Sequence, residues 1–492
     1  MKRGSGILFH LSSLPSSYGI GTLGKEAFNF IDFLAKSGQR YWQILPVGPT
    51  GFGDSPYQSF STFAGNPYFI DLDILIEEGL LTQEEVSAVN WGKDACHVDY
   101  GILYLERAEL LRKAFYRGRR DDADRVHAFV IENREWVNDY ALYMACKAHF
   151  KMKSWEEWSD EALRLSQPKA IERYRNLLEE DIQYHIYIQY LFFRQWESLR
   201  SYGKEKGVRF IGDLPIYVPL DSADVWTHPE FFQLDEKQYP LAVGGVPPDC
   251  FSKTGQLWGT PLYDWDALKK DHYSWWIRRI GACAKLFDVI RIDHFRGFES
   301  YWSVPYGETT AVNGKWITGP GIDFINRIKE QSPYVEFIAE DLGFLTQKVR
   351  DLVTASGFPG MKILQFAFES GDCNDYLPHN YNRNSVVYTG THDNTTIKGW
   401  LQGTKEEEII FASKYLGLNR EEGPSWGLIR GGMSSVSDLF IAQMQDYLDL
   451  PGSDRMNIPG TAQGNWTWRL EKSRLTDELA EKIGKMTRMY GR

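Results

Sequence analysis

Long apolar runs and closely spaced cysteines are both missing from this sequence of 492 residues. Behind Lys2 and Arg3, the apolar run covers only Ile7 to Phe9, which is too short for the core of a signal peptide. No stretch reaches the length of about 20 apolar residues that a transmembrane helix needs. The five cysteines are scattered without a Cys-x-x-Cys spacing, a pattern typical of reduced thiols. We therefore expect a cytoplasmic protein that makes no membrane contact.

An excess of positive charge is absent as well. Lysine and arginine total 55 against 66 acidic residues, which gives a formal net charge of -11. Binding of nucleic acid requires clustered lysine and arginine, so we expect no nucleic-acid partner. The short basic run from Arg117 to Arg120 is followed at once by Asp121 and Asp122, and we interpret it as the solvated end of a helix.

The composition is otherwise that of a soluble globular protein, with 43% hydrophobic and 25% charged residues. The length predicts one large elaborated domain or two to three units. Aromatic residues are abundant, at 15%, and include 17 Trp and 27 Tyr. Two explanations fit this abundance equally well. The aromatic residues belong to a large core, or they line a long cleft in which their flat rings stack on sugars.

Short apolar runs that end in polar or charged residues recur along the chain and predict strands. They lack strict alternation, as expected for parallel strands that are covered on both faces. Helical patterns fill several intervals, such as Trp265 to Lys285 and Thr346 to Ala355. This order predicts an α/β fold, a (β/α)8 TIM barrel with large, mainly helical insertions. An open doubly wound sheet is the alternative, but no glycine-rich dinucleotide fingerprint supports it. The predicted strands are Gly6 to Leu11, Arg40 to Pro46, Val208 to Asp213, Leu286 to Asp293, Val335 to Glu340, Met361 to Phe366, Ser385 to Thr391 and Leu439 to Met444.

About half of the chain exceeds what a barrel needs, since about 250 residues suffice for that fold. We predict that residues 1–74 and 206–492 form the catalytic barrel with its cleft-lining loops. Residues 75–205 are predicted to form a helical insertion subdomain. Within it, the apolar positions from Leu103 to Leu111 and from Tyr184 to Phe192 follow the spacing of amphipathic helices. The insertion carries no recognisable chemical motif.

Carboxylates end three of the predicted strands: Asp293, Glu340 and, after the seventh strand, Asp393. A fourth, Asp213, ends the third strand. Any one of them is readily explained as the cap of the following helix. Together they indicate chemistry, because the carboxyl ends of barrel strands form the active face.

Arg291 strengthens this interpretation, since it precedes Asp293 by two residues and therefore points to the same face of the strand. A neighbouring guanidinium favours an ionised carboxylate, which a covalent nucleophile requires. The alternative is a purely structural Arg–Asp pair inside the barrel. Two carboxyl groups that flank one bond are the minimal apparatus for glycoside cleavage. Glu340, close to other acids, is expected to have a raised pKa and to act as the acid, and Asp393 to orient a sugar hydroxyl.

Histidines His10, His294 and His392 lie at the ends of the same strands and can donate to sugar hydroxyls when neutral. A histidine satisfied by neighbouring backbone is the alternative, and it is favoured for His10. No HExxH or similar spacing appears, so no metal site is predicted. The segment from Val243 to Gly259 combines Gly244, Gly245 and Gly255 as hinges with two prolines, and is predicted to close over a bound chain. An ordinary surface loop is the alternative.

Ordered segments of the sequence resemble one enzyme family. Arg291 to Gly297, Ala339 to Gly343 and Gly390 to Asn394 are similar to the catalytic segments of the amylomaltases, the 4-α-glucanotransferases related to the α-amylases. Further segments resemble the early cleft, the cleft-covering loop and the C-terminal signature of that family. These are Asp54 to Gln58, Phe63 to Tyr68, Pro247 to Phe251, Gly255 to Gly259, Asn457 to Thr461 and Asn465 to Arg469.

The resemblance implies Asp293 as nucleophile, Glu340 as acid/base and Asp393 as transition-state stabiliser. It implies transfer of α-1,4-glucan segments to glucose or glucan acceptors, with maltooligosaccharides as partners. We expect no cofactor, because the sequence has no phosphate loop and glycoside transfer needs no metal, and we expect a monomer or homodimer. A hydrolase of the α-amylase type and a catalytically inactive glucan-binding protein are the rival functions. The residues that the resemblance places along the donor and acceptor subsites are Tyr57, Asp213, Asp249, Gln256, Trp258, Arg291, His294, His392 and Asn465.

Overall fold

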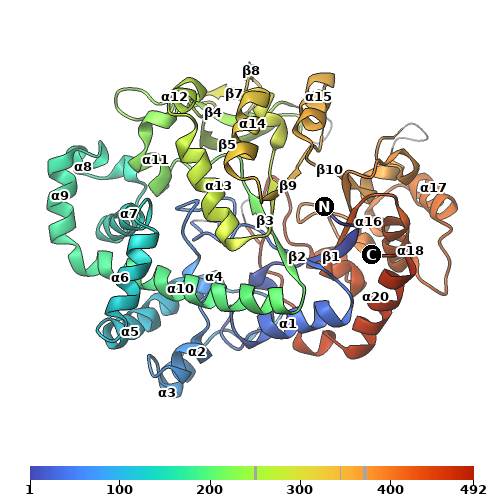
Figure 1. Ribbon diagram of the computed structural model, residues 1–492, viewed down its shortest axis with the longest axis horizontal. Coiled ribbons are helices and arrows are strands. Elements are labelled where there is room, and N and C mark those ends of the chain that lie inside the picture. Colours follow the sequence, from blue (N-terminus) through green and yellow to red (C-terminus); the bar gives the residue numbers. More distant parts are fainter. Residues whose placement is uncertain (52, 249–251, 344, 370–373, 462) are drawn as a thin grey trace.

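A closed barrel of parallel strands forms the centre of the molecule, as a computed structural model shows (Figure 1). The structure describes residues 1–492 except 52, 249–251, 344, 370–373 and 462. Among the described residues the barrel has the order β1-β12-β11-β10-β9-β6-β3-β2 and closes through β1, which pairs with both β12 and β2. The predicted TIM barrel is confirmed. Its strands are β1 (Gly4–Leu8), β2 (Tyr41–Gln43), β3 (Arg209–Leu214), β6 (Val289–Ile292), β9 (Glu336–Ala339), β10 (Gly360–Ile363), β11 (Ser385–Tyr388) and β12 (Leu439–Gln443).

These strands are short and rich in branched apolar residues because both of their faces are covered. Every residue of β6 and of β11 is buried. Side chains inside the barrel fill its interior, and the outer faces pack against helices. The helices of the barrel are α1 (Lys25–Lys36), α13 (Ser274–Leu286), α14 (Gly321–Gln331), α15 (Gln347–Ser356), α16 (Ile397–Gly403), α17 (Glu406–Leu416), α18 (Pro424–Ser434), α19 (Met444–Tyr447) and α20 (Asp477–Met489).

The chain between β2 and β3 is helical. The amphipathic pattern from Leu103 to Leu111 runs through a π-helical turn, Leu103–Arg107, into α5, and the pattern from Tyr184 lies in the 27-residue helix α10. In Figure 1 these blue to green helices lie to one side of the barrel. The helices are α2 (Leu72–Glu77), α3 (Gln83–Ser87), α4 (Tyr100–Ile102), α5 (Ala108–Gly118), α6 (Ala123–Glu132), α7 (Val137–His149), α8 (Glu161–Arg164), α9 (Pro168–Leu177) and α10 (Glu179–Glu205).

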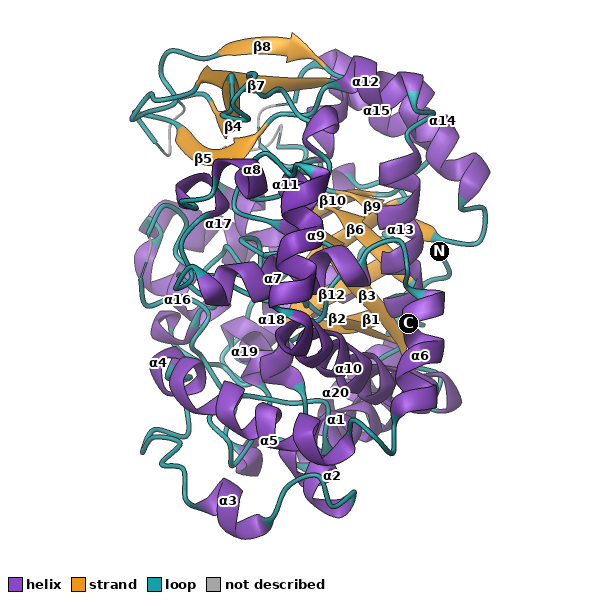
Figure 2. Ribbon diagram, turned by 90° about the vertical axis from the view of Figure 1, so that its left-hand side faces the viewer, coloured by secondary structure: helices purple, strands orange, loops and turns teal. Residues whose placement is uncertain are grey.

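A second sheet, which the sequence analysis did not predict, stands apart from the barrel (Figure 2). In the described part of the chain it has four strands in the antiparallel order β5-β4-β7-β8. The predicted hinge glycines Gly244 and Gly245 lie inside β4 and pair with Ser303 and Trp302 of β7, so the hinge prediction is wrong for them. The strands are β4 (Ala242–Val246), β5 (Gln256–Pro261), β7 (Ser300–Pro305) and β8 (Lys315–Thr318), and the short helices α11 (Ala223–Thr227) and α12 (Trp265–Lys270) flank this region.

Among the helices of the described residues, none is long and apolar enough to cross a bilayer.

Candidate active site

A shared guanidinium joins two of the predicted carboxylates. Asp213 and Arg291 lie opposite each other in the register of β3 and β6. Arg291 Nη1 lies 2.6 and 2.8 Å from the two carboxylate oxygens of Asp213 and 2.9 Å from Oδ1 of Asp293. The side chain of Arg291 is 4% exposed, whereas that of Asp293 is 30% exposed. Arg291 and Asp213 therefore form a buried ion pair beneath Asp293. Asp293 itself extends from this pair toward the open side of the barrel.

The charged groups of this cluster shift one another's pKa values. Burial disfavours the guanidinium, but Asp213 and Asp293 outweigh it and raise the pKa of Arg291 well above its ordinary value. Burial raises the pKa of Asp213, and Asp293 raises it further, while Arg291 opposes both effects. Arg291 is therefore the permanent positive charge that allows two carboxylates to lie side by side.

Glu340 follows β9, the strand that pairs with β6 on the side away from β3. Its Oε2 accepts a hydrogen bond from the backbone N–H of His294 at 2.7 Å, and its Oε1 accepts one from Leu342 at 2.8 Å. His294 adopts a left-handed conformation with φ 50°, an uncommon backbone for a residue other than glycine, directly after Asp293. This turn aims the His294 amide at Glu340 and fixes the carboxyl beside Asp293.

The pKa of Glu340 is raised to about 7, chiefly by burial and further by the charge of Asp293, against the opposing effect of Arg291. The raised pKa was expected from the neighbouring acids, whereas burial of the carboxyl group is the larger cause. A carboxyl group in this range is protonated for a substantial fraction of the time near neutral pH.

His294 and Trp258 connect the barrel to the second sheet. Their rings meet edge to face, with centroids 4.9 Å apart, and Trp258 Nε1 donates to Oε1 of Gln256 at 3.2 Å. Burial lowers the pKa of His294 to about 4, so its imidazole is neutral at physiological pH. Gln256 and Trp258 belong to β5, which places this edge of the second sheet against the end of β6.

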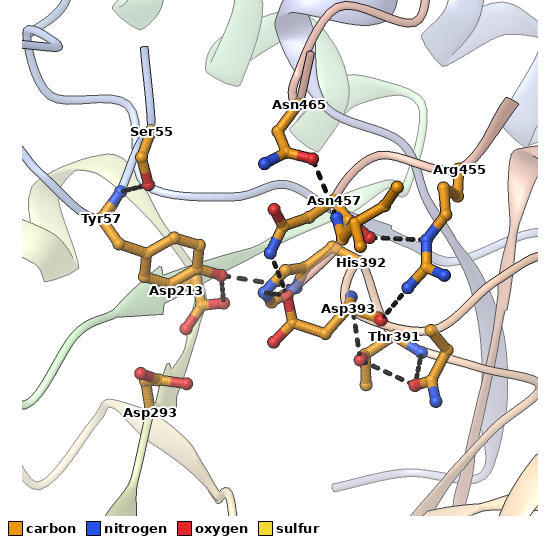
Figure 3. Close-up of polar contacts among 12 residues, drawn as sticks. Ser55, Tyr57, Asp213, Asp293, Thr391, His392, Asp393, Arg455, Asn457 and Asn465 are labelled. Carbon is orange, nitrogen blue, oxygen red and sulfur yellow. Dashed lines mark hydrogen bonds and ion pairs between the residues drawn. The ribbon is translucent and has the colours of Figure 1, made fainter. Parts of the chain in front are cut away.

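Tyr57, His392 and Asp393 form the other side of the site (Figure 3). Tyr57 donates its hydroxyl hydrogen to Oδ2 of Asp213 at 2.8 Å, and its ring stacks on His392 with centroids 5.1 Å apart. Burial and the nearby carboxylates raise the pKa of Tyr57 well above its ordinary value, so the phenol stays a donor. His392 Nε2 lies 3.5 Å from Oδ1 of Asp393, whose side chain is half exposed.

Two residues at Asp393 were not identified from the sequence. Asn457 donates from Nδ2 to Oδ1 of Asp393 at 2.6 Å, and Arg455 donates from Nη2 to the backbone carbonyl of Asp393 at 2.5 Å (Figure 3). Asn457 lies within the segment Asn457 to Thr461 that resembles the C-terminal signature of the family, which was the available signal; no pattern marked Arg455. Asn465 accepts from the Ile458 amide and donates to the carbonyl of Thr461, so its side chain fastens the loop that carries Asn457.

The loop that bears Asp393 is anchored from the carboxyl ends of the two neighbouring strands, β10 and β12. Gln365 and Gln443 both donate to the backbone carbonyl of Thr395, at 2.8 and 3.3 Å. The buried carboxyl of Asp446 accepts from the hydroxyl of Thr389 at 2.5 Å and from the amide of Ile397 at 2.7 Å. These anchors lie far apart in sequence, and sequence reasoning missed them.

Asp249, His10 and possible metal ligands remain to be placed. Asp249 lies outside the described residues. His10 accepts a hydrogen bond from the backbone amide of Leu45 at 3.2 Å, which matches the structural alternative favoured for it. Within the described ranges, the His, Cys, Asp and Glu side chains form no cluster of three suited to hold a metal ion.

Replacing Arg291 by methionine is expected to destabilise the fold, because Asp213 and Asp293 then face each other without the bridging charge. We expect a loss of about 3 kcal/mol in the free energy of unfolding at pH 7. The loss shrinks toward pH 5, since a protonated carboxyl no longer repels its neighbour. Urea denaturation at both pH values measures this difference. As a control, Arg327→Met removes an exposed pair with Glu330 and is expected to cost less than about 1 kcal/mol.

Comparison with known proteins decides the family of this chain. A sequence signature described as 4-alpha-glucanotransferase matches residues 9–476. The chain is 50% identical over 486 residues to a 4-alpha-glucanotransferase of Clostridium butyricum, which covers 98% of this chain and 99% of the relative. This chain belongs to the 4-alpha-glucanotransferase family. The 4-alpha-glucanotransferase of Thermus thermophilus is 46% identical over 498 residues, covering 99% of this chain and 98% of the relative.

A solved structure of the same kind superimposes on the whole molecule. The amylomaltase from Streptococcus agalactiae in complex with acarbose has a TM-score of 0.98 and 42% sequence identity, and each chain is covered to 100%. The fold and the 4-alpha-glucanotransferase activity expected from the motifs are thereby confirmed.

Proposed function

We propose that this 4-alpha-glucanotransferase transfers segments of α-1,4-glucans by a retaining double displacement on Asp293. The proposal rests on two neighbouring carboxyl groups whose surroundings favour different protonation states. Asp293 touches the buried guanidinium of Arg291, which stabilises its negative charge. Glu340 has its pKa raised to about 7 and can supply a proton. An ionised nucleophile beside a protonated acid is the arrangement that retaining glycoside chemistry requires.

In the first step, an oxygen of Asp293 forms a bond to the anomeric carbon while the bond from that carbon to the glycosidic oxygen breaks. Glu340 gives its proton to the departing oxygen, so the shortened glucan leaves as an alcohol. In the second step, the 4-hydroxyl of the acceptor gives its proton to Glu340 and attacks the same carbon, which releases Asp293. Each step inverts the anomeric carbon, and the α configuration is retained.

The opposite side of the site holds the donor sugar in this proposal. Asp393 binds ring hydroxyls of the residue under attack, and these bonds strengthen as the ring flattens toward the transition state. Tyr57 and His392 provide a stacked aromatic wall beside it. The neutral imidazole of His294 and the ring of Trp258 line the neighbouring part of the cleft. Gln256 and Asn465 belong to the same substrate-binding set, the latter through the loop that it fastens.

A ligand bound to a relative supports the choice of substrate. Acarbose is the bound molecule of the Streptococcus agalactiae amylomaltase complex. Maltooligosaccharides are accordingly the substrates proposed here. We also propose that the protein has two parts: a barrel formed by residues 1–74 and 206–492, and a helical insertion formed by residues 75–205. We propose a cytoplasmic location and a monomeric or homodimeric state.

Incubation with maltotriose tests transfer against its rivals. Transfer produces a ladder of longer oligosaccharides together with glucose. A hydrolase of the α-amylase type produces only shorter sugars, and a glucan-binding protein without catalysis leaves maltotriose intact. Chromatography of the products separates these three outcomes, and either of the last two would contradict the proposal.

Replacing Asn457 by alanine is expected to lower kcat about tenfold, because Asp393 loses the donor that orients its carboxylate. The thermal unfolding midpoint should change little, since the contact lies on the exposed side of the site. Initial rates of glucose release from maltotriose measure the effect. Asn29→Ala is the matched control, because it removes a similar amide–carboxylate contact, with Glu26, from the surface of α1. Equal rates for the Asn457→Ala variant and the control would contradict the positioning role.

A further inference from the structure

A partly exposed tryptophan on the second sheet is held in a fixed orientation. Trp316 lies on β8 and is 41% exposed, an unusual exposure for so large an apolar residue. The guanidinium of Arg296 lies over its ring, 4.1 Å from the centroid. Trp302, its partner in the β7–β8 register, approaches edge to face with centroids 5.2 Å apart. Trp302 is itself fixed, because its Nε1 donates to the carbonyl of Ala311 at 2.8 Å.

These contacts determine which part of the indole meets solvent. Arg296 covers one face of the ring and Trp302 borders it, so the exposed surface is the remaining face and the outer edge. A flat apolar face that is already immobilised loses little conformational entropy when a ligand stacks on it. The apolar C–H face of a glucose ring is a suitable partner, as aromatic side chains combine large contact area with directional preference.

Trp316 is also tied to the turn that follows Asp293. Arg296 belongs to the turn Phe295–Phe298, which starts two residues after Asp293. The amide of Phe295 donates to the backbone carbonyl of Glu340 at 3.1 Å. The charge of Glu340 acts on Arg296 as well, opposing the decrease in its pKa that burial causes. The Trp316 ring is therefore one side chain away from the turn that holds Glu340.

A second contact keeps β8 against this turn. The amide of Gly319, just past β8, donates to the carbonyl of Glu299 at 2.7 Å. A side chain at Gly319 would collide with the carbonyl oxygens of Gly297 and Phe298, at 2.7 and 2.4 Å. The close approach of the two backbones leaves room for glycine alone. The position of β8, and with it that of Trp316, is therefore defined relative to the turn Phe295–Phe298.

We propose that Trp316 is a stacking platform for a glucose residue of the acceptor glucan, beyond the sugar that receives the new bond. The proposal rests on the function proposed above, in which Glu340 acts on the departing and the incoming oxygen. We place the acceptor chain from Glu340 toward Arg296 and the face of β8, because the turn Phe295–Phe298 contacts Glu340 at one point and Trp316 at another. The donor sugar lies on the other side, where Asp393 follows β11, a strand separated from β9 by β10.

Acceptor-length dependence tests this platform. With a glycosyl fluoride as a fixed donor, the KM of acceptors is compared from glucose to maltopentaose for Trp316→Ala. Loss of a stacked ring is expected to raise the KM of the longer acceptors about fivefold to tenfold. The KM of glucose, which is too short to reach the platform, should change less than about twofold. Trp316→Phe, which keeps a flat ring, should recover most of the affinity.

Tyr334→Ala is the matched control, because Tyr334 is 97% exposed and precedes β9 at the opposite end of the barrel. It should leave acceptor KM values unchanged at every length. An equal rise in KM for glucose and for long acceptors, accompanied by a lower thermal unfolding midpoint, would show a structural role and overturn the platform. Unchanged KM values for Trp316→Ala would overturn it as well. Failure of the wild-type enzyme to make longer sugars would instead overturn the proposed function.

Discussion

Replacing Asp293 by asparagine is expected to lower kcat for transfer from maltotriose by about ten-thousandfold, the scale of losing a covalent nucleophile. The amide has nearly the shape of the carboxylate but carries no charge and does not form the glycosyl ester. Its carbonyl oxygen still accepts a hydrogen bond from Arg291, so the buried ion pair of Arg291 and Asp213 stays in place. Glucose release and the thermal unfolding midpoint measure activity and fold separately.

Asp288→Asn is the matched control for this experiment. Asp288 directly precedes β6, at its amino end, where it pairs with Arg200 and accepts from the amide of Phe210. The same chemical change at that end of the strand should leave transfer near the wild-type rate. Near-normal transfer by the Asp293→Asn variant, or an equal loss in both variants, would contradict the assignment of Asp293.

Glu340→Gln is expected to give the second-largest effect, a decrease in kcat of about a hundredfold to ten-thousandfold with maltotriose. Glutamine does not supply the proton that the departing sugar oxygen needs. A glycosyl fluoride needs less assistance in leaving, so its first step should persist in the variant and release fluoride. A fluoride electrode and product chromatography distinguish the two donors. If the first-turnover burst of fluoride were lost to the same extent as glucose release from maltotriose, the role of Glu340 as acid would be contradicted.

The pH dependence of the wild-type enzyme tests the same residue independently. In the proposed mechanism Glu340 must be protonated to cleave the glycosidic bond, and its pKa is raised to about 7 by burial and by Asp293. The rate of cleavage should therefore fall as the pH rises through about 7, and this alkaline decline should disappear for the fluoride donor. Glu336→Gln, which alters a carboxylate at the amino end of β9, should keep the wild-type profile.

The barrel could be predicted from the sequence because its strands are covered on both faces. Such strands appear as short apolar runs, and all eight predicted runs overlap a barrel strand of the described structure. The second sheet left no such signal. β4 contains Gly244 and Gly245, which indicated a hinge, and β8 is largely exposed and therefore lacks an apolar run. Pairing with β7 converts that glycine segment into a strand.

The cluster of carboxyl groups proposed as catalytic was predictable because each of them follows a strand, and the link between Arg291 and Asp293 follows from the two-residue period of a strand. The pairing of Asp213 with Arg291 depends on the register of two strands far apart in sequence, which no local pattern reveals. Asn457 and Asp446 are likewise joined to the loop of Asp393 by long-range hydrogen bonds. Residues that support a site through the fold are visible only once the fold is known.

Trapping the covalent intermediate tests the mechanism most directly. The mechanism predicts that the Glu340→Gln variant forms the glycosyl ester from a glycosyl fluoride but turns it over slowly, because no base activates the acceptor. Mass spectrometry of the intact protein, followed by peptide mapping, measures the added sugar and its position. The mechanism predicts one glycosyl group on the peptide that contains Asp293. A sugar attached to Asp393 or to another carboxylate, or release of fluoride without any covalent adduct, would contradict it.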